Sequence, residues 1–204
     1  MIMMKQLTGA ALAGAMALAA LAPAAQAQTG AAAPALRYGA PISGLCMFSQ
    51  DELIATSTVG KYVVNRLTQL GQQVRSELSA QQTTLESDAK ALEAQKASLS
   101  QDQYAQRANA FLQRRNDFEQ LVNQRNQEMQ ATQQKAFGRV FTEAQTLMQD
   151  AFQAHNCAIL VDGRSVLAVA PSMDITPQVV QGLNSKITQF PFERERADQA
   201  AASR

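Results

Sequence analysis

The chain has 204 residues, of which 17% are charged and 5% aromatic, and it contains no tryptophan. Its 18 Lys and Arg residues against 17 Asp and Glu give a formal net charge of +1, so no overall charge would attract nucleic acid. So few aromatic residues argue against one large compact core and favour an extended arrangement of the apolar side chains.

The first 27 residues have the three-part layout of a secretory signal peptide. Lys5 precedes an Ala- and Leu-rich run over residues 7–21, and the small-residue triplet Ala25-Gln26-Ala27 follows. The run is shorter than the roughly 20 residues that a membrane-spanning helix needs, although an uncleaved membrane anchor is the alternative. We expect cleavage after Ala27, export to the periplasm, and a flexible leader over residues 28–41, where small residues, Pro and Gly predominate.

A short apolar run over residues 42–48 predicts a buried strand that leads into a helix. Ser49 is a suitable N-cap, and Glu52 three residues later completes a capping-box pattern. No proline follows before Ser98, so the pattern predicts one helix of about 45 residues, about 70 Å long. Its apolar positions form a narrow stripe that is typical of a coiled coil: Val63, Leu67, Leu70, Val74, Leu78, Leu85, Leu92 and Leu99.

The periodic pattern lapses at residues 98–103, where we place the tip of an arm. Ser100 can cap a new helix, and a second proline-free stretch then runs from about Gln101 to His155. Two helices of similar length with a short connector predict an antiparallel hairpin over residues 49–155, and one continuous rod is the alternative. The stripe of the second helix comprises Tyr104, Ala108, Phe111, Phe118, Val122, Met129, Ala136, Val140, Ala144, Leu147 and Ala151.

Two short β-type runs follow the second helix. Residues 157–161 and 165–171 flank Asp162-Gly163, a dipeptide typical of the turn in a β-hairpin. Because the helical hairpin returns the chain to where it left, residues 42–48 and 156–190 should form one base. The sequence therefore predicts an α+β fold, in which a long coiled-coil arm stands on a small three-stranded sheet.

The last predicted helix belongs to the same base. Thr176 is the expected N-cap and Pro177 the first helical residue, and the helix should end near Ile187. Residues 191–204, a charged and Ala-rich end, are predicted to form a disordered tail.

The two cysteines, Cys46 and Cys157, lie on segments that are expected to be neighbours in this base. Their separation excludes a C-x-x-C redox pair and a self-contained zinc site. An oxidising compartment permits a disulfide or a close thiol pair, and two small buried apolar residues are the alternative. Such a thin sheet also has open edges, so we expect the base to self-associate.

Three stretches of the sequence resemble the Skp/OmpH family of periplasmic chaperones. They are the opening GLCMFSQDELIATSTVGKYVVNRL, the long Gln-, Lys- and Glu-rich hairpin, and the closing NCAILVDGRSVLAVAPSMDITPQVVQGLN. The resemblance covers roughly residues 42–187. It implies a jellyfish-like homotrimer whose arms enclose a cavity, where unfolded outer-membrane proteins are held without ATP and kept from aggregating. Members of that family are commonly strongly basic, and this chain departs from that pattern.

A holdase of this kind needs many weak apolar contacts rather than a catalytic group. The candidate client-binding residues lie on the second predicted helix, where their alternative role is to hold the two helices together: Phe111, Leu112, Phe118, Leu121, Met129 and Phe137. Five cations form a candidate basic tip surface for acidic client segments or anionic lipid head groups, with a balanced solvated helix face as the alternative: Lys90, Lys96, Arg107, Arg114 and Arg115.

The sequence offers little for catalysis or cofactor binding. His155 is the only histidine, and its position suits a cation at a helix C-terminus better than a catalytic triad. His and Cys residues are too few for the usual metal sites, and no phosphate-binding or dinucleotide-binding glycine motif occurs. We therefore expect no enzymatic activity and no cofactor. The alternative function is an adaptor of the cell envelope, which would need a rigid arm with a continuous, strongly apolar seam.

Overall fold

A computed structural model describes residues 37–196 of the chain. The predicted signal peptide, most of the predicted leader and residues 197–204 lie outside the described residues. The elements in chain order are the strand β1 (Leu45–Phe48), the helices α1 (Gln50–Thr56), α2 (Thr58–Gln95) and α3 (Gln101–Ala154), the strand β2 (Ile159–Asp162), and the helix α4 (Thr176–Lys186). Two short 3-10 turns, Gly163–Ser165 and Pro171–Met173, lie between β2 and α4.

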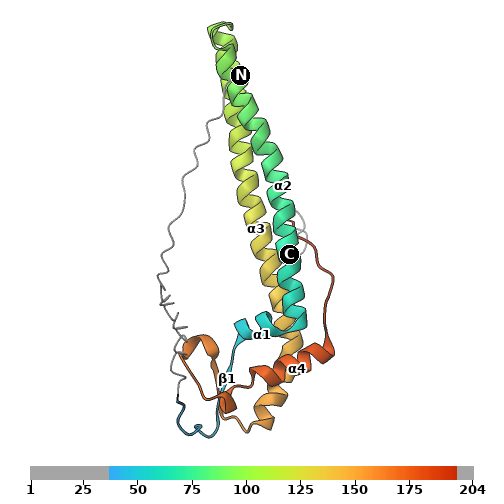
Figure 1. The fold of residues 1–204 in the computed structure, drawn as a ribbon. Coiled ribbons are helices and arrows are strands. Elements are labelled where there is room, and N and C mark those ends of the chain that lie inside the picture. Colours follow the sequence, from blue (N-terminus) through green and yellow to red (C-terminus); the bar gives the residue numbers. More distant parts are fainter. Residues whose placement is uncertain (1–36, 197–204) are drawn as a thin grey trace, which may run out of the picture. The chain divides into compact units, whose positions relative to one another are not determined.

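The helices α2 and α3 form the arm, and they pack side by side as an antiparallel hairpin (Figure 1). They contain 38 and 54 residues. At the tip, the Ser100 hydroxyl accepts a hydrogen bond from the backbone N–H of Gln103, and the Gln103 side chain accepts one from the backbone N–H of Ser100. This capping box ends the turn and starts α3 where the sequence predicted. Among the described residues, no helix is both long and apolar enough to cross a membrane.

Burial along the arm is uneven. Side chains of both stripes are buried only near the base, in what we call the root half of the arm, residues 58–74 and 128–154. In the distal half, residues 75–127, no side chain is buried, and the predicted stripe is only partly covered. The coiled-coil seam is therefore closed at the root and open toward the tip. The buried apolar residues of the root half are Val59, Val63, Leu70, Val74, Ala136, Val140, Ala144 and Ala151.

The first helical segment is broken near its start, where the sequence predicted one continuous helix. Ser57 separates α1 from α2, with its backbone in an extended conformation and its side chain buried. Its N–H donates to the Leu53 carbonyl, and its hydroxyl accepts from the Gly60 N–H, so one serine ends α1 and caps α2. The break lets α1 cross toward α4 while Leu53 and Val59 both stay buried.

The sheet is smaller than predicted. β1 and β2 pair in parallel, with Leu45 opposite Ile159 and Phe48 opposite Asp162. The predicted third strand over residues 165–171 is absent from the described chain, and a 3-10 turn takes the place of the β-hairpin. Asp162 accepts a hydrogen bond from the Arg164 N–H and pairs with the Arg164 guanidinium at 2.8 Å, which closes the turn locally. The following segment has no strand to pair with, and Leu167 is fully exposed.

The caps of α1 and α4 differ in part from the prediction. The Ser49 hydroxyl caps α1 as predicted, but its backbone N–H donates to the Thr176 hydroxyl at 2.9 Å instead of to Glu52. Thr176 is the first residue of α4 rather than its N-cap, because Asp174 accepts the Thr176 N–H. These bonds join the start of α1 to the start of α4.

The hydrophobic core lies where α1, α4 and the strands meet the root half of the arm. Its fully buried members come from α1, α2, α3, α4 and the residue that precedes α4, and β1 adds the buried side chains of Cys46 and Phe48. They are Leu53, Val59, Val63, Val140, Ile175, Val179 and Leu183.

The predicted disordered tail is wrong for residues 191–196. After α4 the chain runs in an irregular, extended path along the arm, and we call residues 187–196 the strap (Figure 1). The Phe192 ring packs against Tyr62 of α2, and the Glu195 N–H donates to the Thr132 hydroxyl of α3 at 2.9 Å. Two phenylalanines within a charged stretch give this segment enough apolar surface to dock.

The break before α2 should make Gly60 intolerant of a side chain. In Gly60→Ala, the new Cβ would lie 2.7 Å from both the Ser57 hydroxyl oxygen and the Ile54 Cα, and closer still to the Ile54 carbonyl oxygen. We expect this variant to lower the free energy of unfolding by about 2 to 3 kcal/mol, because backbone must move.

The matched control is Gly138→Ala in α3, where nothing lies within 4 Å of the new Cβ. It should be neutral or stabilising by up to about 1 kcal/mol, because alanine favours helix. Urea unfolding followed by circular dichroism at one protein concentration measures both variants. Equal effects of the two substitutions would contradict the close packing at Ser57.

Candidate functional site

The arm carries the predicted client-binding residues along one helix rather than in one pocket. From Phe111 to Phe137 the α3 backbone rises about 40 Å, so these side chains form an elongated surface. Leu112 is the most accessible, with 44% of its surface exposed. The other five are partly buried. The sequence placed Leu112 beside the apolar stripe, and its exposure follows from that position.

Two hollows on the arm contain three of the predicted residues. In the distal half, Phe118 and Leu121 of α3 line a shallow hollow together with Leu85 of α2. Its rim carries an ion pair between Arg114 and Asp88, at 2.7 Å. An apolar floor with a charged rim can accept an apolar side chain whose neighbours stay in water.

Phe137 lies in a second hollow near the base, which we call the root groove. Its apolar lining comes from three helices: Ile54 of α1, Val64 of α2, and Phe137 and Phe141 of α3. Sequence reasoning missed Val64, which is 43% exposed. It follows directly after the stripe residue Val63, and an apolar residue one position off a stripe faces partly outward.

The predicted basic tip surface is largely paired within the arm. Of its five cations, Arg114 contacts Asp88 of the facing helix, Arg115 contacts Glu119 at 3.5 Å, and Lys96 lies 4.0 Å from Glu93. Asp88 belongs to α2, and Glu119 lies one turn after Arg115 on α3. Three of the five cations are therefore paired with carboxylates of the arm, and such exposed pairs contribute little to stability.

An ionic cluster joins the arm to the strap. Arg194 of the strap pairs with Glu77 of α2 at 3.1 Å and lies 3.4 Å from Glu128 of α3. Arg125 of α3 pairs with the same two carboxylates, at 3.2 and 3.0 Å. The hydrogen bond from Arg194 lowers the pKa of Glu77 below its ordinary value of 4.5, and Arg125 adds to this effect. The cluster cross-links α2, α3 and the strap where the root half meets the distal half.

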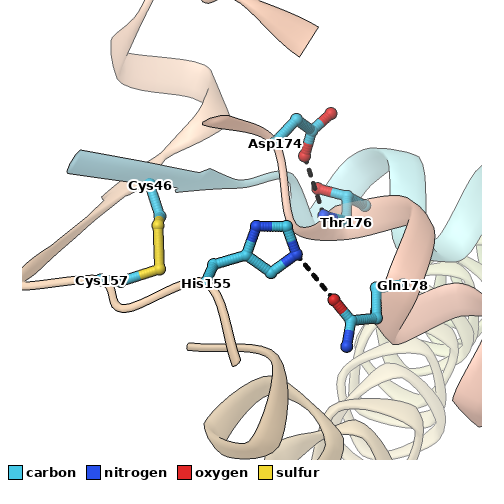
Figure 2. The surroundings of a disulfide bond; sticks show 6 residues. All are labelled: Cys46, His155, Cys157, Asp174, Thr176 and Gln178. Carbon is cyan, nitrogen blue, oxygen red and sulfur yellow. Dashed lines mark hydrogen bonds between the residues drawn. A yellow bond between two sulfur atoms is a disulfide. The ribbon is translucent and has the colours of Figure 1, made fainter. Parts of the chain in front are cut away.

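A disulfide joins Cys46 of β1 to Cys157, the third residue after α3 (Figure 2). The two Cα atoms are 5.7 Å apart, and 111 residues separate the cysteines in sequence. The bond therefore closes a loop that contains the whole arm. Sequence reasoning placed the two cysteines on neighbouring segments of the base, and the parallel pairing of β1 with β2 brings those segments together.

His155 lies at the C-terminal end of α3, next to the disulfide (Figure 2). Its Nε2 atom lies 2.7 Å from the Gln178 side-chain oxygen of α4. Within residues 37–196, no group of three or more His, Cys, Asp or Glu side chains is arranged to hold a metal ion. His155 thus links the end of the arm to α4.

A family model described as outer membrane protein (OmpH-like) matches residues 45–183 of the chain. The structure is similar to the crystal structure of a protein from Caulobacter crescentus CB15 that is provisionally described as an outer membrane chaperone (OmpH-like). The two chains are 39% identical, with a TM-score of 0.70, over 80% of this chain and 96% of the other. No curated protein shows a significant match to the chain.

Opening the disulfide should destabilise the base strongly. For Cys46→Ser combined with Cys157→Ser, we expect the free energy of unfolding to fall by about 2 to 5 kcal/mol, because the unfolded chain regains the freedom of a long loop. Thermal unfolding with and without reductant measures the loss, and intact-mass analysis verifies the bond in the wild type. An unchanged unfolding temperature after reduction would contradict a stabilising cross-link.

The ionic cluster should give the protein a pH-dependent stability. The lowered pKa means that Glu77 stabilises the fold above about pH 4.5 and loses this effect as pH falls through its folded-state pKa. Because Glu77 is 45% exposed, Glu77→Gln should cost only about 0.5 to 1 kcal/mol at pH 7, and less at pH 3. Unfolding at both pH values tests this. The control is Glu119→Gln, whose exposed pair should contribute nothing measurable.

Proposed function

The chain belongs to the OmpH-like outer membrane protein family, and from this premise we propose that it is an exported, ATP-independent holdase for unfolded outer-membrane proteins. In this proposal the signal peptide is removed after Ala27 and the mature chain works in the periplasm. The chaperone role is supported by the similarity to the Caulobacter protein.

The observation that carries the proposal is the open distal half of the arm. A helix pair of this length that served only as a rigid spacer would bury its seam along its whole length. Here the seam leaves apolar side chains of α3 partly or largely accessible beyond the root half, among them Phe111, Leu112 and Leu121. Such a surface offers an unfolded chain many separate places to bind.

Binding of this kind has a high overall affinity, although each single contact is weak. One apolar side chain contributes at most about 1.5 to 3 kcal/mol when fully buried, and less on a half-covered surface. Several such contacts along one client chain raise the overall affinity through their effective concentration. Each single contact still breaks easily, so the client can be released without ATP.

Self-association of the base would complete the chaperone. The sheet of the described chain has only two strands, and the outer edge of β1 is covered only where the Ile175 N–H donates to the Met47 carbonyl. Apolar side chains of the base are also exposed: Ile42, Ile159 and Leu167. In the proposed homotrimer these surfaces meet, and three arms enclose a cavity for the client. Because the basic tip residues are largely paired within the arm, we assign no separate lipid-binding role to them.

The functional test is suppression of aggregation. Unfolded β-barrel proteins of unrelated sequence are diluted from urea with and without the purified chain, and light scattering is followed in the absence of ATP. The proposal expects protection of several such clients, together with a trimeric mass in solution. Protection of none would favour the alternative, an envelope adaptor with one defined partner.

A triple substitution tests the arm surface. We expect Leu112→Ser, Leu121→Ser and Phe137→Ser together to weaken client binding by about tenfold or more, because three apolar contacts are lost from a multivalent surface. The matched control replaces three exposed glutamines of the same helix, Gln106, Gln113 and Gln134, with serine. Undiminished protection by the apolar triple variant, with its mass and helicity intact, would remove these residues from the client surface.

A further inference from the structure

The strap lies beyond the part of the chain that matches the family model. That match ends at residue 183, whereas the strap comprises residues 187–196. Its contacts with the arm are nevertheless specific, and they involve both helices. A segment that the family model does not include thus covers part of the arm's root half (Figure 1).

Two aromatic rings anchor the strap. Phe190 and Phe192 lie 5.5 Å apart between ring centroids, and each lies 6.5 Å from the ring of Tyr62 on α2. On the opposite side, the Arg139 guanidinium of α3 stands 5.9 Å above the Phe190 ring. The rings therefore contact both helices, and one hollow between the strap and α3 and another between the strap and α2 flank them. We call the surface of α2 and α3 that the strap covers the strap groove.

The residues at and after Phe192 also make polar contacts with both helices. Arg66 of α2 donates to the Phe192 carbonyl and pairs with Glu193 at 2.8 Å. On α3, Lys135 pairs with Glu195 at 2.8 Å, and the Thr132 hydroxyl accepts the Glu195 N–H. Two of these bonds reach the strap backbone, which every peptide offers regardless of its sequence.

We propose that the strap groove is a binding site for extended segments of unfolded outer-membrane proteins, and that the strap is its built-in competitor. This inference rests on the proposed holdase function. The groove accepts an extended chain with aromatic residues two positions apart, followed by charged residues. Strands of outer-membrane barrels alternate apolar and polar residues and carry aromatic residues near their ends, so they present the same pattern.

The exposure of the strap is compatible with its displacement by another peptide chain. None of its residues is buried, and the side chain of Glu193 is 80% exposed. Segments with few buried contacts open at low free-energy cost in native proteins. A competitor of this kind reduces the apparent affinity of the groove by the fraction of molecules in which the groove is open.

The experiment uses full-length proteins and a defined probe. The probe is a fluorescein-labelled peptide with the strap sequence, ITQFPFERER, and its control has both phenylalanines replaced by serine. Binding is measured by fluorescence anisotropy to the wild type, to Phe190→Ser/Phe192→Ser, and to the matched control Gln189→Ser, at an exposed position of the strap. We expect the double variant to bind the probe about tenfold or more tightly than the other two, because its own strap no longer fills the groove.

Two further results are expected of the same samples. The serine peptide should bind none of the proteins, and an unfolded β-barrel protein diluted from urea should displace the bound probe. Equal affinity of all three proteins for the probe, or failure of the unfolded protein to displace it, would overturn the inference and leave the strap as a clamp. Aggregation assays of the wild type report separately on the holdase function.

A tryptophan reporter provides an answer even if the double variant fails to fold. The chain has no tryptophan, so Phe192→Trp places a single one in the strap. Addition of the unlabelled tryptophan-free strap peptide should shift its emission to longer wavelength as the strap is displaced into water. Unchanged emission at peptide concentrations that saturate the anisotropy signal would overturn the competition.

Discussion

Packing of α1 and α4 against the root half of the arm is the interaction on which the rest of the structure depends. Two long helices joined only at a tip bury little surface by themselves. At the root, α1 and α4 add Leu53, Val179 and Leu183 to the seam residues Val63 and Val140, and all five are fully buried. The arm is anchored there and projects beyond this core. The same arrangement leaves the distal half accessible, so the buried and the accessible apolar side chains occupy different parts of one hairpin.

The arm followed from the sequence because helical periodicity and capping are local. Ser100 alone indicated where α3 begins, and the two apolar stripes predicted which faces meet. Features that depend on distant partners were missed or wrong. Residues 165–171 have strand-like composition but no strand beside them. The tail prediction was wrong for residues 191–196 because their charged average composition hid Phe192. Ser57 was missed because one serine in a proline-free stretch gives no strong signal of a break.

In the candidate site, too, the sequence predicted local features and missed those that depend on distant partners. Position relative to the stripe predicted the accessibility of Leu112, since side-chain direction is a local property of a helix. The pairing of Arg114 at the tip was missed, because Asp88 reaches it from the facing helix and only the register of the hairpin shows that. The strap groove needed three separate segments, so no sequence pattern could indicate it. The family resemblance supplied the general role, and the chain's own contacts supply the details.

The disulfide between Cys46 and Cys157 also has a mechanical consequence. It turns residues 46–157 into a closed ring that is pinned at the base. A force applied at the tip acts on both helices, and β1 and β2 cannot separate to let one helix slide along the other. Bending of the distal half, where the seam is only partly covered, then takes up the load. The base keeps its covalent connection while the tip moves.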